Sequence, residues 1–408
     1  MYLFALYKPR NVVKRRSRHT RSSMKPTSAP DIRIEPVRSK RDLRLFLETP
    51  LNLHKDEPFW APLPMFLEKE QLDRSANPFW KHADRELFLA FRGERAVGRI
   101  AAVIDHDLDA VTGERVGVWG YFACEDDPAV ATSLFRAAED WHNARPEGRA
   151  AFLRGPLNPS LNYAAGMLVE GFERFPSFMN PYNPPYYPPL VEACGMEKEQ
   201  DLFYYRFCRA ANFDICNQEL GKNFARGAEH YTLRRSTRAT YDEDMRLLAD
   251  LFTRCWADNW GFTPMHAEEI RHSWAVMRWL PAPSELTFLE YKGEAVGMSL
   301  YGADLGRLFK RLNGRISLSA PWHLFAGLRA VDGVRLYMLG VTKKHRRGLA
   351  IFRLLLGTIN AAADTAALDY VDAGWVLEDN VNMNQICERL KGERLTRSRI
   401  YRRECGRV

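Results

Sequence analysis

Two stretches of the chain show the alternating apolar and polar pattern of a β-hairpin. Residues 86–98 read ELFLAFRGERAVG, with a turn at Gly93. Residues 285–297 read ELTFLEYKGEAVG, a pattern almost the same as that of the first stretch. Two hairpins so alike, far apart in one chain, predict two copies of one structural unit.

The order of the other elements recurs as well. Each half reads as hairpin, strand, loop, helix, strand, a helix led by Asn, a Gly and a final strand. Asn183 precedes Gly195 by the same interval at which Asn380 precedes Gly392. The repeat predicts an α/β fold with mixed α+β sheets, arranged as two tandem domains. We place a basic tail at 1–30, a first domain at 31–210, a linker at 211–227 and a second domain at 228–408.

The segment before the first hairpin predicts a strand, a helix and an irregular loop. Residues 32–37 alternate in polarity, and Ser39 is placed to cap a helix from Lys40 to Glu48. Prolines at positions 50, 58, 62 and 64 then predict irregular backbone, because proline lacks the N–H donor that a helix or strand requires.

Composition places the chain among globular proteins with two domains of ordinary size. It has 408 residues, of which 46% are hydrophobic and 27% charged. No apolar run reaches about 18 residues, so no transmembrane helix is predicted. The seven cysteines form no Cys-x-x-Cys pair. This indicates reduced thiols in a cytoplasmic protein, with neither a disulfide framework nor a metal site.

The net charge of +8 arises in the tail. Residues 1–30 contain eight Lys and Arg residues and no acid, which leaves the rest of the chain balanced. Such a tail is expected to be disordered, and its composition also suits an organellar transit peptide. Because the excess charge is confined there, the sequence predicts no nucleic-acid-binding face.

The stretch from Val334 to Leu356 combines a strand, a basic loop and a helix. Residues 334–341 are mainly apolar, residues 342–350 are basic and contain glycine, and residues 351–356 have helical periodicity. Backbone N–H groups and the helix dipole converge at such a junction, which favours a phosphate or pyrophosphate. The loop has neither a Walker nor a dinucleotide-binding motif, so a solvated basic turn is the alternative.

The matching loop of the first half carries the opposite charge. Residues 124–128 are Cys-Glu-Asp-Asp-Pro. Three carboxylates repel a pyrophosphate, and Pro128 offers no N–H donor. We therefore expect the second half to bind the anionic co-substrate, and the first half to shape and support the substrate groove.

The basic loop resembles the coenzyme A loop of the GNAT acyltransferases, Gln/Arg-x-x-Gly-x-Gly/Ala, with His345 at its first position. The resemblance implies acyl-CoA as co-substrate and no metal. It also implies that N–H groups of the strand 336–341 bind the thioester carbonyl and stabilise the oxyanion. The cofactor-binding residues that it implies are Leu339, Val341, His345, Arg346, Arg347, Gly348, Leu349 and Ala350.

The reaction of such an enzyme requires a base. An amine attacks a thioester only when it is neutral, so a carboxylate or histidine must accept its proton. Glu378, at the end of the predicted strand 368–377, is the first candidate, Asp379 the second and His345 the third. The alternative is that the two acids cap the following helix. The tyrosine with which many family members protonate the thiolate is missing, and Cys387 and Glu388 lie near its position.

Two further segments concern the acceptor. Trp256, Trp260 and Phe262 lie on a predicted loop where this fold places its acceptor, and we expect them to bind substrate; a buried aromatic plug is the alternative. Residues 305–312 form a basic amphipathic pattern, followed by aromatic residues at 322–325. This pattern predicts peripheral contact with the inner face of a membrane, or else an ordinary helix packed on the sheet.

A longer pattern resembles a bacterial family of tandem GNAT-like proteins that includes bacterial ceramide synthases. The segments that carry it are 77–83, 87–90 with 97–100, 155–158, 180–183 with 186–187, and 259–262. The resemblance implies transfer of an acyl group from acyl-CoA to a primary amine such as a sphingoid base. The alternatives are an N-acetyltransferase for a small polar amine or peptide, and a GNAT-like binding module without catalysis.

Overall fold

The computed structural model describes residues 31–222, 230–279, 282–315, 320–346, 350–363 and 368–406. Of the two units into which the chain divides, the second, Ile32–Val408, holds every helix and strand described below. None of the described helices combines the length and apolar composition that crossing a bilayer requires.

The first half of the unit contains a hairpin-led sheet and its helices. In chain order its elements are β1 (Ile32–Pro36), α1 (Lys40–Leu53), α2 (Met65–Leu72), η1 (Pro78–Lys81), β2 (Ala83–Arg92), β3 (Arg95–Asp105), α3 (His106–Thr112), β4 (Val116–Cys124), α4 (Pro128–Asn143), β5 (Phe152–Gly155), β6 (Leu157–Asn158), β7 (Ala164–Ala165), β8 (Met167–Glu170), α5 (Tyr187–Ala193) and β9 (Glu197–Cys208).

The second half repeats this order. Its elements are α6 (Arg209–Lys222), β10 (Tyr231–Arg235), α7 (Tyr241–Trp256), α8 (Ala267–Trp279), β11 (Ser284–Tyr291), β12 (Glu294–Ala303), α9 (Gly306–Leu312), α10 (Ala320–Arg329), β13 (Gly333–Val341), η3 (Lys343–His345), α11 (Ala350–Ala363), β14 (Tyr370–Leu377), α12 (Val381–Arg389) and β15 (Glu393–Glu404).

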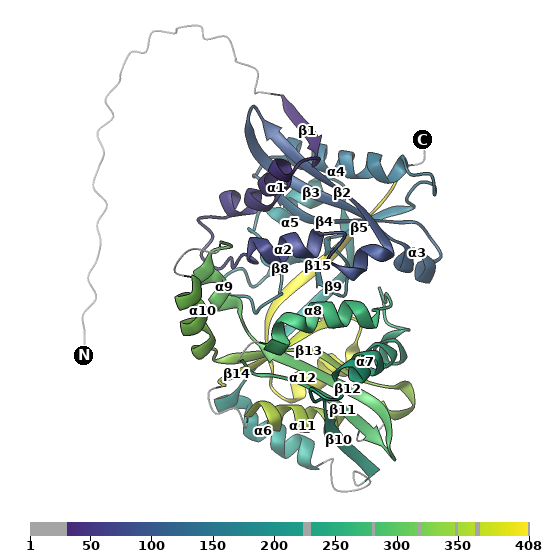
Figure 1. Ribbon diagram of the computed structural model, residues 1–408, viewed down its shortest axis with the longest axis vertical. Coiled ribbons are helices and arrows are strands. Elements are labelled where there is room, and N and C mark those ends of the chain that lie inside the picture. The colour runs from purple at the N-terminus through teal and green to yellow at the C-terminus, as the bar shows by residue number, and fades with distance from the viewer. Residues whose placement is uncertain are drawn as a thin grey trace, which may run out of the picture. The chain divides into compact units, whose positions relative to one another are not determined.

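One large mixed sheet joins the two halves (Figure 1). Its strand order among the described residues is β1-β2-β3-β4-β5-β15-β9-β14-β13-β12-β11-β10, with β8 paired to β15. In each half three antiparallel strands lead to one parallel pair, which is β4 with β5 in the first half and β13 with β14 in the second. This recurrence confirms the predicted α/β class and the internal repeat.

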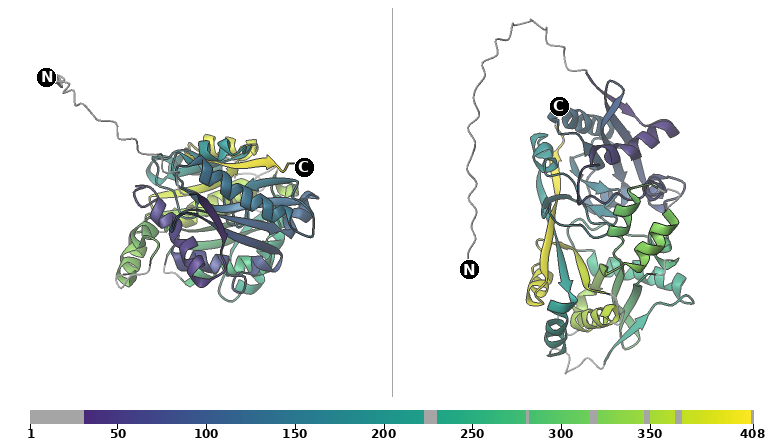
Figure 2. Two further views of the ribbon diagram at one scale, coloured as in Figure 1. Left: turned by 90° about the horizontal axis from the view of Figure 1, so that it is seen from above. Right: turned by 90° about the vertical axis from the view of Figure 1, so that its left-hand side faces the viewer.

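The two halves exchange their final strands. β9, from the first half, pairs with β14 of the second, and β15, from the second half, pairs with β5 of the first. β9 and β15 also pair with each other along most of their length, and both run along the junction of the halves in Figures 1 and 2. The exchange makes the sheet continuous, and the predicted domain boundaries remain a prediction.

Successive side chains of a strand point to opposite faces of the sheet, so they pack against different layers of helices. In β2, Leu87 and Leu89 pack against α1 and α2, whereas Phe88 and Ala90 pack against α4. In β11, Phe288 packs against α7 and the adjacent Leu289 against α11. Each half is therefore a sheet between two helical layers. Within the predicted linker, residues up to 222 belong to α6, which packs on β9 and α11.

Helix α1 is longer than predicted. Ser39 caps it as expected, in a capping box with Asp42, but the helix continues past Pro50 to Leu53. Pro50 cannot donate to the carbonyl of Phe46, four residues earlier. The guanidinium of Arg99 donates to that carbonyl instead, at 2.8 Å. A partner from β3 thus compensates for the missing helical bond, and the prediction of irregular backbone at this proline was wrong.

Candidate active site

The parallel strands β13 and β14 separate part-way along their length. They pair from Gly333 with Tyr370 to Leu336 with Ala373, and the described pairing ends there. Beyond this point β13 follows β12 while β14 follows β9. Alternate N–H and C=O groups of β13 therefore face a V-shaped gap instead of a neighbouring strand.

A β-bulge lies where the gap opens. Leu300 of β12 pairs with Met338, and Tyr301 pairs with Leu336, so Tyr337 has no opposite residue. A bulge of this kind turns the side chains and N–H groups of its strand away from the regular ladder. The predicted strand 334–341, expected to supply these N–H groups, is confirmed as β13.

The side chain of Tyr337 lies at this bulge, and the surroundings of its hydroxyl are unusual. Its ring meets Trp274 of α8 edge-on at 5.8 Å between centroids. The hydroxyl is buried and has no hydrogen-bond partner among the described residues. Burial raises the pKa of Tyr337 well above the usual tyrosine value, so the hydroxyl keeps its proton.

The first half contains the same strand divergence, but its own chain fills it. The side-chain oxygen of Asn158 accepts a hydrogen bond from the backbone N–H of Tyr121 on β4, at 2.6 Å. Gly120 permits this approach, since a Cβ there would lie 1.9 Å from the carbonyl oxygen of Leu157. The strand donor that could bind a thioester is thus satisfied internally, and the first half offers no equivalent gap.

The carboxylates of the acidic loop in the first half are also bound by neighbouring residues of the same half. Asp127 caps α4 by accepting from the N–H of Ala129 at 2.8 Å. Arg92 forms an ion pair with Asp127 and another with Glu125. These contacts neutralise the carboxylates and leave no cationic site for a pyrophosphate, in line with the predicted division of roles.

A single cavity of about 670 Å³ connects the gap in the second half with the first half. From the first half it is lined by α1, α2 and the segments around 60–63 and 156–183. From the second half it is lined by β13, β14, α6, α8, α11 and α12. Most of the lining side chains are aliphatic or aromatic. Its size is that of a site for a drug-sized or lipid-sized ligand.

The three aromatic residues predicted to bind substrate all line this cavity. Trp256 ends α7, and Trp260 and Phe262 follow in the loop that leads to α8. The guanidinium of Arg154, from β5, lies 5.1 Å from the ring centroid of Trp260. This contact links the loop to the first half, and substrate binding by the three residues stays a prediction.

The predicted pyrophosphate loop is described only in part. Residues 347–349, which include three predicted cofactor-binding residues, lie outside the described residues. Leu339 lines the cavity, whereas Val341 is buried at the end of β13 and Ala350 is buried at the start of α11. The region therefore joins strand and helix as predicted, with a short 3₁₀ turn between them.

The basic side chains of residues 343–346 differ in what they contact. Arg346 is exposed, and its guanidinium donates to the carbonyls of Val341 and Cys255. Lys343 forms an ion pair with Asp258. Lys344 is exposed and makes no hydrogen bond or ion pair within the described part of the chain. Lys344 is therefore the cation most available to an anionic ligand.

The three predicted catalytic residues do not meet in the cavity. Glu378 forms an ion pair with Lys198 at 2.6 Å and accepts from the N–H of Asp201 at 3.0 Å. Asp379 accepts from the amide of Gln200 at 3.2 Å. Both acids thus contact β9, and neither is among the cavity-lining residues of the described chain.

His345 lies apart from those acids. Its Nδ1 is 2.9 Å from the hydroxyl of Tyr231, and its ring lies 4.9 Å from that of Tyr291. It also does not line the described cavity. The proposed role of these three residues as bases is therefore still a prediction, which their positions do not favour.

A buried ionic network holds the closed end of the gap. Arg206 of β9 donates two hydrogen bonds, of 2.7 and 2.6 Å, to the carboxylate of Asp372 on β14. Ser177, from the first half, donates to the same carboxylate. Burial raises the pKa of Asp372, while Arg206 opposes the shift. These contacts hold β9 and β14 together at the point from which β13 and β14 diverge.

Some cavity residues carry no sequence signal. His54 is buried on the first-half side, with its Nε2 2.7 Å from the hydroxyl of Tyr187. Burial, with a smaller contribution from Arg99, lowers the pKa of His54 to about 3, so its ring is neutral. Tyr337 was also missed, because an aromatic residue within an apolar strand reads as core. Only the register of the strands singles it out.

Comparison with known proteins identifies the family. The bacterial ceramide synthase of Caulobacter vibrioides is 34% identical over 380 residues, which cover 91% of this chain and 97% of that protein. This chain belongs to that family. Protein YghO of Escherichia coli is 29% identical over 374 residues, which cover 90% of this chain and 94% of that protein. No model of a protein family matches the sequence.

Solved structures show the same fold as this family member. A tandem GNAT protein from the clavulanic acid biosynthesis pathway superposes with a TM-score of 0.56 at 15% identity, over 93% of this chain and all of that one. A GCN5-related N-acetyltransferase from Sphaerobacter thermophilus gives 0.52 at 12% identity, over 92% and 97%. The predicted tandem GNAT-like fold and family are confirmed, and with them the acyltransferase class.

Proposed function

We propose that this protein is an acyl-CoA-dependent N-acyltransferase whose acceptor is the amine of a long-chain lipid, such as a sphingoid base. The observation that carries the proposal is the cavity, which starts at the unfilled gap between β13 and β14 and continues between apolar walls into the first half. The relative named bacterial ceramide synthase supports the same acceptor.

The gap between the strands suits the thioester. Its carbonyl oxygen would accept a hydrogen bond from an unpaired N–H of β13 near the bulge, and the same donor would stabilise the oxyanion that forms on attack. In the first half the corresponding donor is bound by Asn158. One acyl-CoA per chain, in the second half, follows from this difference.

In the proposed reaction, the amine replaces the CoA thiol at the carbonyl carbon of the thioester. The neutral amine attacks, a C–N bond forms, and the tetrahedral intermediate collapses with loss of the C–S bond. The nitrogen loses a proton, and the departing thiolate gains one. Tyr337 is the proposed donor to that thiolate, because it lies at the bulge, is protonated and has no other partner among the residues that the structure describes. This role would fill the position left by the missing tyrosine of the last helix.

The CoA moiety would leave the gap toward the start of α11. Lys344 and the N-terminal end of that helix are the groups that would meet its phosphates. Arg346 instead supports the loop through its two carbonyl contacts. Reversal of charge at Lys344 should therefore weaken CoA binding without loss of the fold, whereas reversal at Arg346 should destabilise the loop.

The apolar walls predict a dependence on chain length. Each buried methylene contributes about 0.8 kcal/mol, which is about a fourfold change in dissociation constant. Affinity for acyl-CoA should therefore rise steadily from acetyl-CoA toward long chains, until the cavity is full. A small polar amine would leave this surface uncovered.

The test is turnover by the purified full-length protein. Release of the CoA thiol and mass spectrometry of the amide would be followed with palmitoyl-CoA and sphinganine, and with acetyl-CoA and spermidine. Trp260→Ala should raise KM for the lipid amine, and Val111→Ala, at an apolar surface residue 47% exposed, is the control. Faster turnover of the polar pair would favour the small-amine alternative. Binding of acyl-CoA without any amide product would favour the binding module.

A membrane surface is the proposed source of the acceptor. On α10, Trp322 and Phe325 are 70% and 52% exposed, and the guanidinium of Arg329 lies 4.2 Å from the ring centroid of Phe325. α10 packs on α9, which lines the cavity with Gly306 and Phe309. Exposed aromatic residues next to cations are suited to an anionic bilayer. A lipid amine taken up at α10 would thus reach the cavity past α9.

Vesicle sedimentation tests this route separately from catalysis. The wild-type protein should sediment with vesicles that contain phosphatidylglycerol and less with neutral vesicles. Trp322→Ala/Phe325→Ala should lower the bound fraction at least about tenfold, because each buried aromatic contributes about 1.5–3 kcal/mol. Val111→Ala, at another exposed apolar residue, is the control. Equal binding of the double variant would refute membrane contact at α10.

A further inference from the structure

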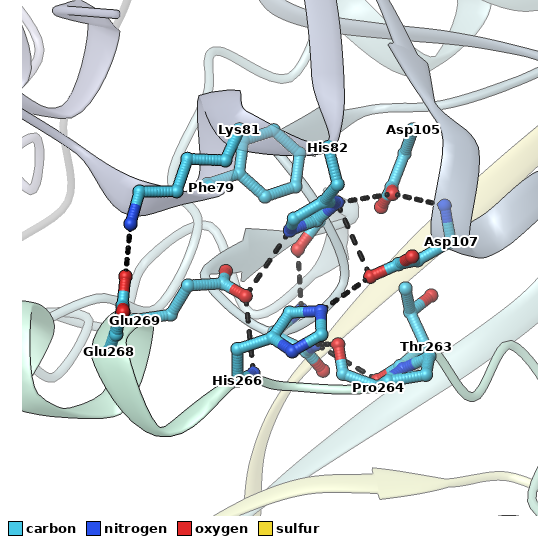
Figure 3. Close-up of polar contacts among 12 residues, drawn as sticks. Phe79, Lys81, His82, Asp105, Asp107, Thr263, Pro264, His266, Glu268 and Glu269 are labelled. Carbon is cyan, nitrogen blue, oxygen red and sulfur yellow. Dashed lines mark hydrogen bonds and ion pairs between the residues drawn. The ribbon is translucent and has the colours of Figure 1, made fainter. Parts of the chain in front are cut away.

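Outside the cavity, five titratable side chains converge where the two halves meet (Figure 3). His82 follows η1, and Asp105 and Asp107 lie at the start of α3, all in the first half. His266 and Glu269 come from the start of α8 in the second half. No part of the acyl transfer described above uses these residues.

Three of their atoms surround a common point. The Oδ2 of Asp107 lies 2.8 Å from Nε2 of His266 and 3.4 Å from Nδ1 of His82. One ligand atom from each of the three residues lies within 4.8 Å of the others. Ligands bound at about 2.0–2.2 Å around a tetrahedral ion are separated from one another by about 3.3–3.6 Å. The separations of 2.8 and 3.4 Å from Asp107 lie near this spacing, and the limit of 4.8 Å for the whole set exceeds it, so binding would require side-chain adjustment.

A fourth oxygen is placed beside these atoms. The Oδ1 of Asp105 lies 3.1 Å from Nδ1 of His82, on the same side of the imidazole as Asp107. Asp105 is 1% exposed, and its Oδ2 has no hydrogen-bond partner within the described part of the chain. A buried carboxylate oxygen without a donor carries an unmatched partial charge, which a cation would neutralise.

The other ring nitrogen of His82, Nε2, contacts a carboxylate, as in many metal sites. Its Nε2 lies 3.3 Å from Oε1 of Glu269. Glu269 is itself fixed by Tyr163, whose hydroxyl is 3.1 Å from Oε2, and by the N–H of His266, 3.2 Å from Oε1. In metal sites a carboxylate on the far nitrogen of a histidine accepts the N–H there, and the near nitrogen of His82 would bind the ion once it loses the proton that faces Asp105.

We propose that His82, Asp107 and His266 bind a divalent transition-metal ion, with Asp105 as the fourth ligand and Zn²⁺ as the ion that fits best. Two imidazole nitrogens with carboxylate oxygens are a zinc ligand set, whereas Mg²⁺ and Ca²⁺ select oxygen ligands. The His266 side chain is 56% exposed, which gives the ion access from solvent. The sequence expectation of a protein without metal is revised by this proposal.

The ion would link the two halves beside the cavity. His266 directly follows the segment that contains Trp260, Phe262 and Met265, all of which line the cavity. A bond from this segment to α3 would hold the predicted acceptor loop in its place. The proposal concerns metal binding and does not depend on the acyl transfer reaction.

A proton competes with the metal at this site. Burial lowers the pKa of His82, but hydrogen bonds and charges from Asp105 and Glu269 prevail and raise it to about 10. Without an ion, His82 is therefore a cation between two carboxylates. A metal must displace that proton, and a site that remains a protonated ion-pair network is the contrary outcome.

The full-length protein, purified on an affinity tag without histidines, would be treated with chelator and returned to Zn²⁺, Mn²⁺ or Mg²⁺. Bound metal would be measured by mass spectrometry after gel filtration, and the melting temperature with and without each ion. We expect about one Zn²⁺ per chain, a higher melting temperature with Zn²⁺, a weaker effect of Mn²⁺ and no effect of Mg²⁺.

Variants separate this site from incidental zinc binding. Asp107→Asn/His266→Gln should lose the bound Zn²⁺ and its effect on melting, and Glu269→Gln should weaken binding by about 10–100-fold. Glu268→Gln is the matched control, since Glu268 is adjacent but pairs with Lys81 on the surface. Zinc binding that is absent in the wild type, or equal in the double variant, would overturn the proposal.

Discussion

The unpartnered hydroxyl of Tyr337 leads to a prediction in which stability and activity change in opposite directions. Tyr337→Phe removes one oxygen and keeps the ring. The contacts with Trp274, at 5.8 Å, and with the guanidinium of Arg335, at 5.1 Å from the ring centroid, would remain. The effect of the substitution is therefore that of the hydroxyl alone.

The magnitude follows from the burial of that hydroxyl. A buried polar group without a partner costs about 1–3 kcal/mol. Its removal should raise the free energy of unfolding of the ligand-free protein by about 1–2 kcal/mol. Tyr370→Phe is the matched control, because the hydroxyl of Tyr370 donates to the buried Asp304 at 2.9 Å. Loss of that donor should lower the free energy of unfolding by about 1–3 kcal/mol.

Urea unfolding monitored by tryptophan fluorescence would compare the two variants with the wild type. Turnover would then be measured with long-chain acyl-CoA. If Tyr337 protonates the thiolate, Tyr337→Phe should lower kcat about tenfold or more while KM for acyl-CoA stays the same. A less stable Tyr337→Phe protein would show that the hydroxyl has a partner in the free enzyme. An unchanged kcat would refute the role of acid.

Three further predictions concern binding, catalysis and pH. Dissociation constants from calorimetry for acyl-CoA of increasing length should fall about fourfold per methylene until they level off, and a flat series would contradict an acyl-binding cavity. Glu378→Gln should change kcat by less than about threefold, because its carboxylate is bound to Lys198, whereas loss of a general base would cost about a hundredfold or more. Burial would raise the pKa of Asp201, but hydrogen bonds from Arg399 and nearby cations lower it. Since the folded pKa lies below the unfolded value of about 3.9, this stabilisation is present above that pH and is lost as the pH falls through the folded pKa. Asp201→Asn should therefore be less stable than the wild type by about 3 kcal/mol at neutral pH, and urea titrations should show the difference shrinking below about pH 4.

Local patterns predicted the elements of the fold well. The two hairpins, the cap at Ser39 and the strand that became β13 all depend on residues close together in sequence, where side-chain period and turn chemistry decide the structure. The repeat then supplied the relation between the halves, because two copies of one pattern fold alike. The exception was Pro50, whose missing donor is compensated by Arg99, a residue far along the chain.

The candidate site was predicted less completely, since its chemistry depends on long-range orientation. Arg346 belongs to a basic loop in the sequence, yet its guanidinium is bound by two backbone carbonyls. Glu378 stands at the expected strand end, but Lys198 of the neighbouring strand binds it. The cluster around His82 combines residues from both halves, and no spacing in the sequence relates them. A strand pattern likewise does not specify which strand lies beside it.

The exchange of β9 and β15 has a consequence for biosynthesis. Tandem domains usually fold one after another as they leave the ribosome. Here β5 must wait for β15, and β9 must wait for β14, so neither half of the sheet is complete while the chain is being made. Until then each half exposes a strand edge with unpaired backbone groups, the kind of surface that promotes aggregation. We therefore expect the two halves to mature together after synthesis, under the protection of chaperones that bind exposed strands.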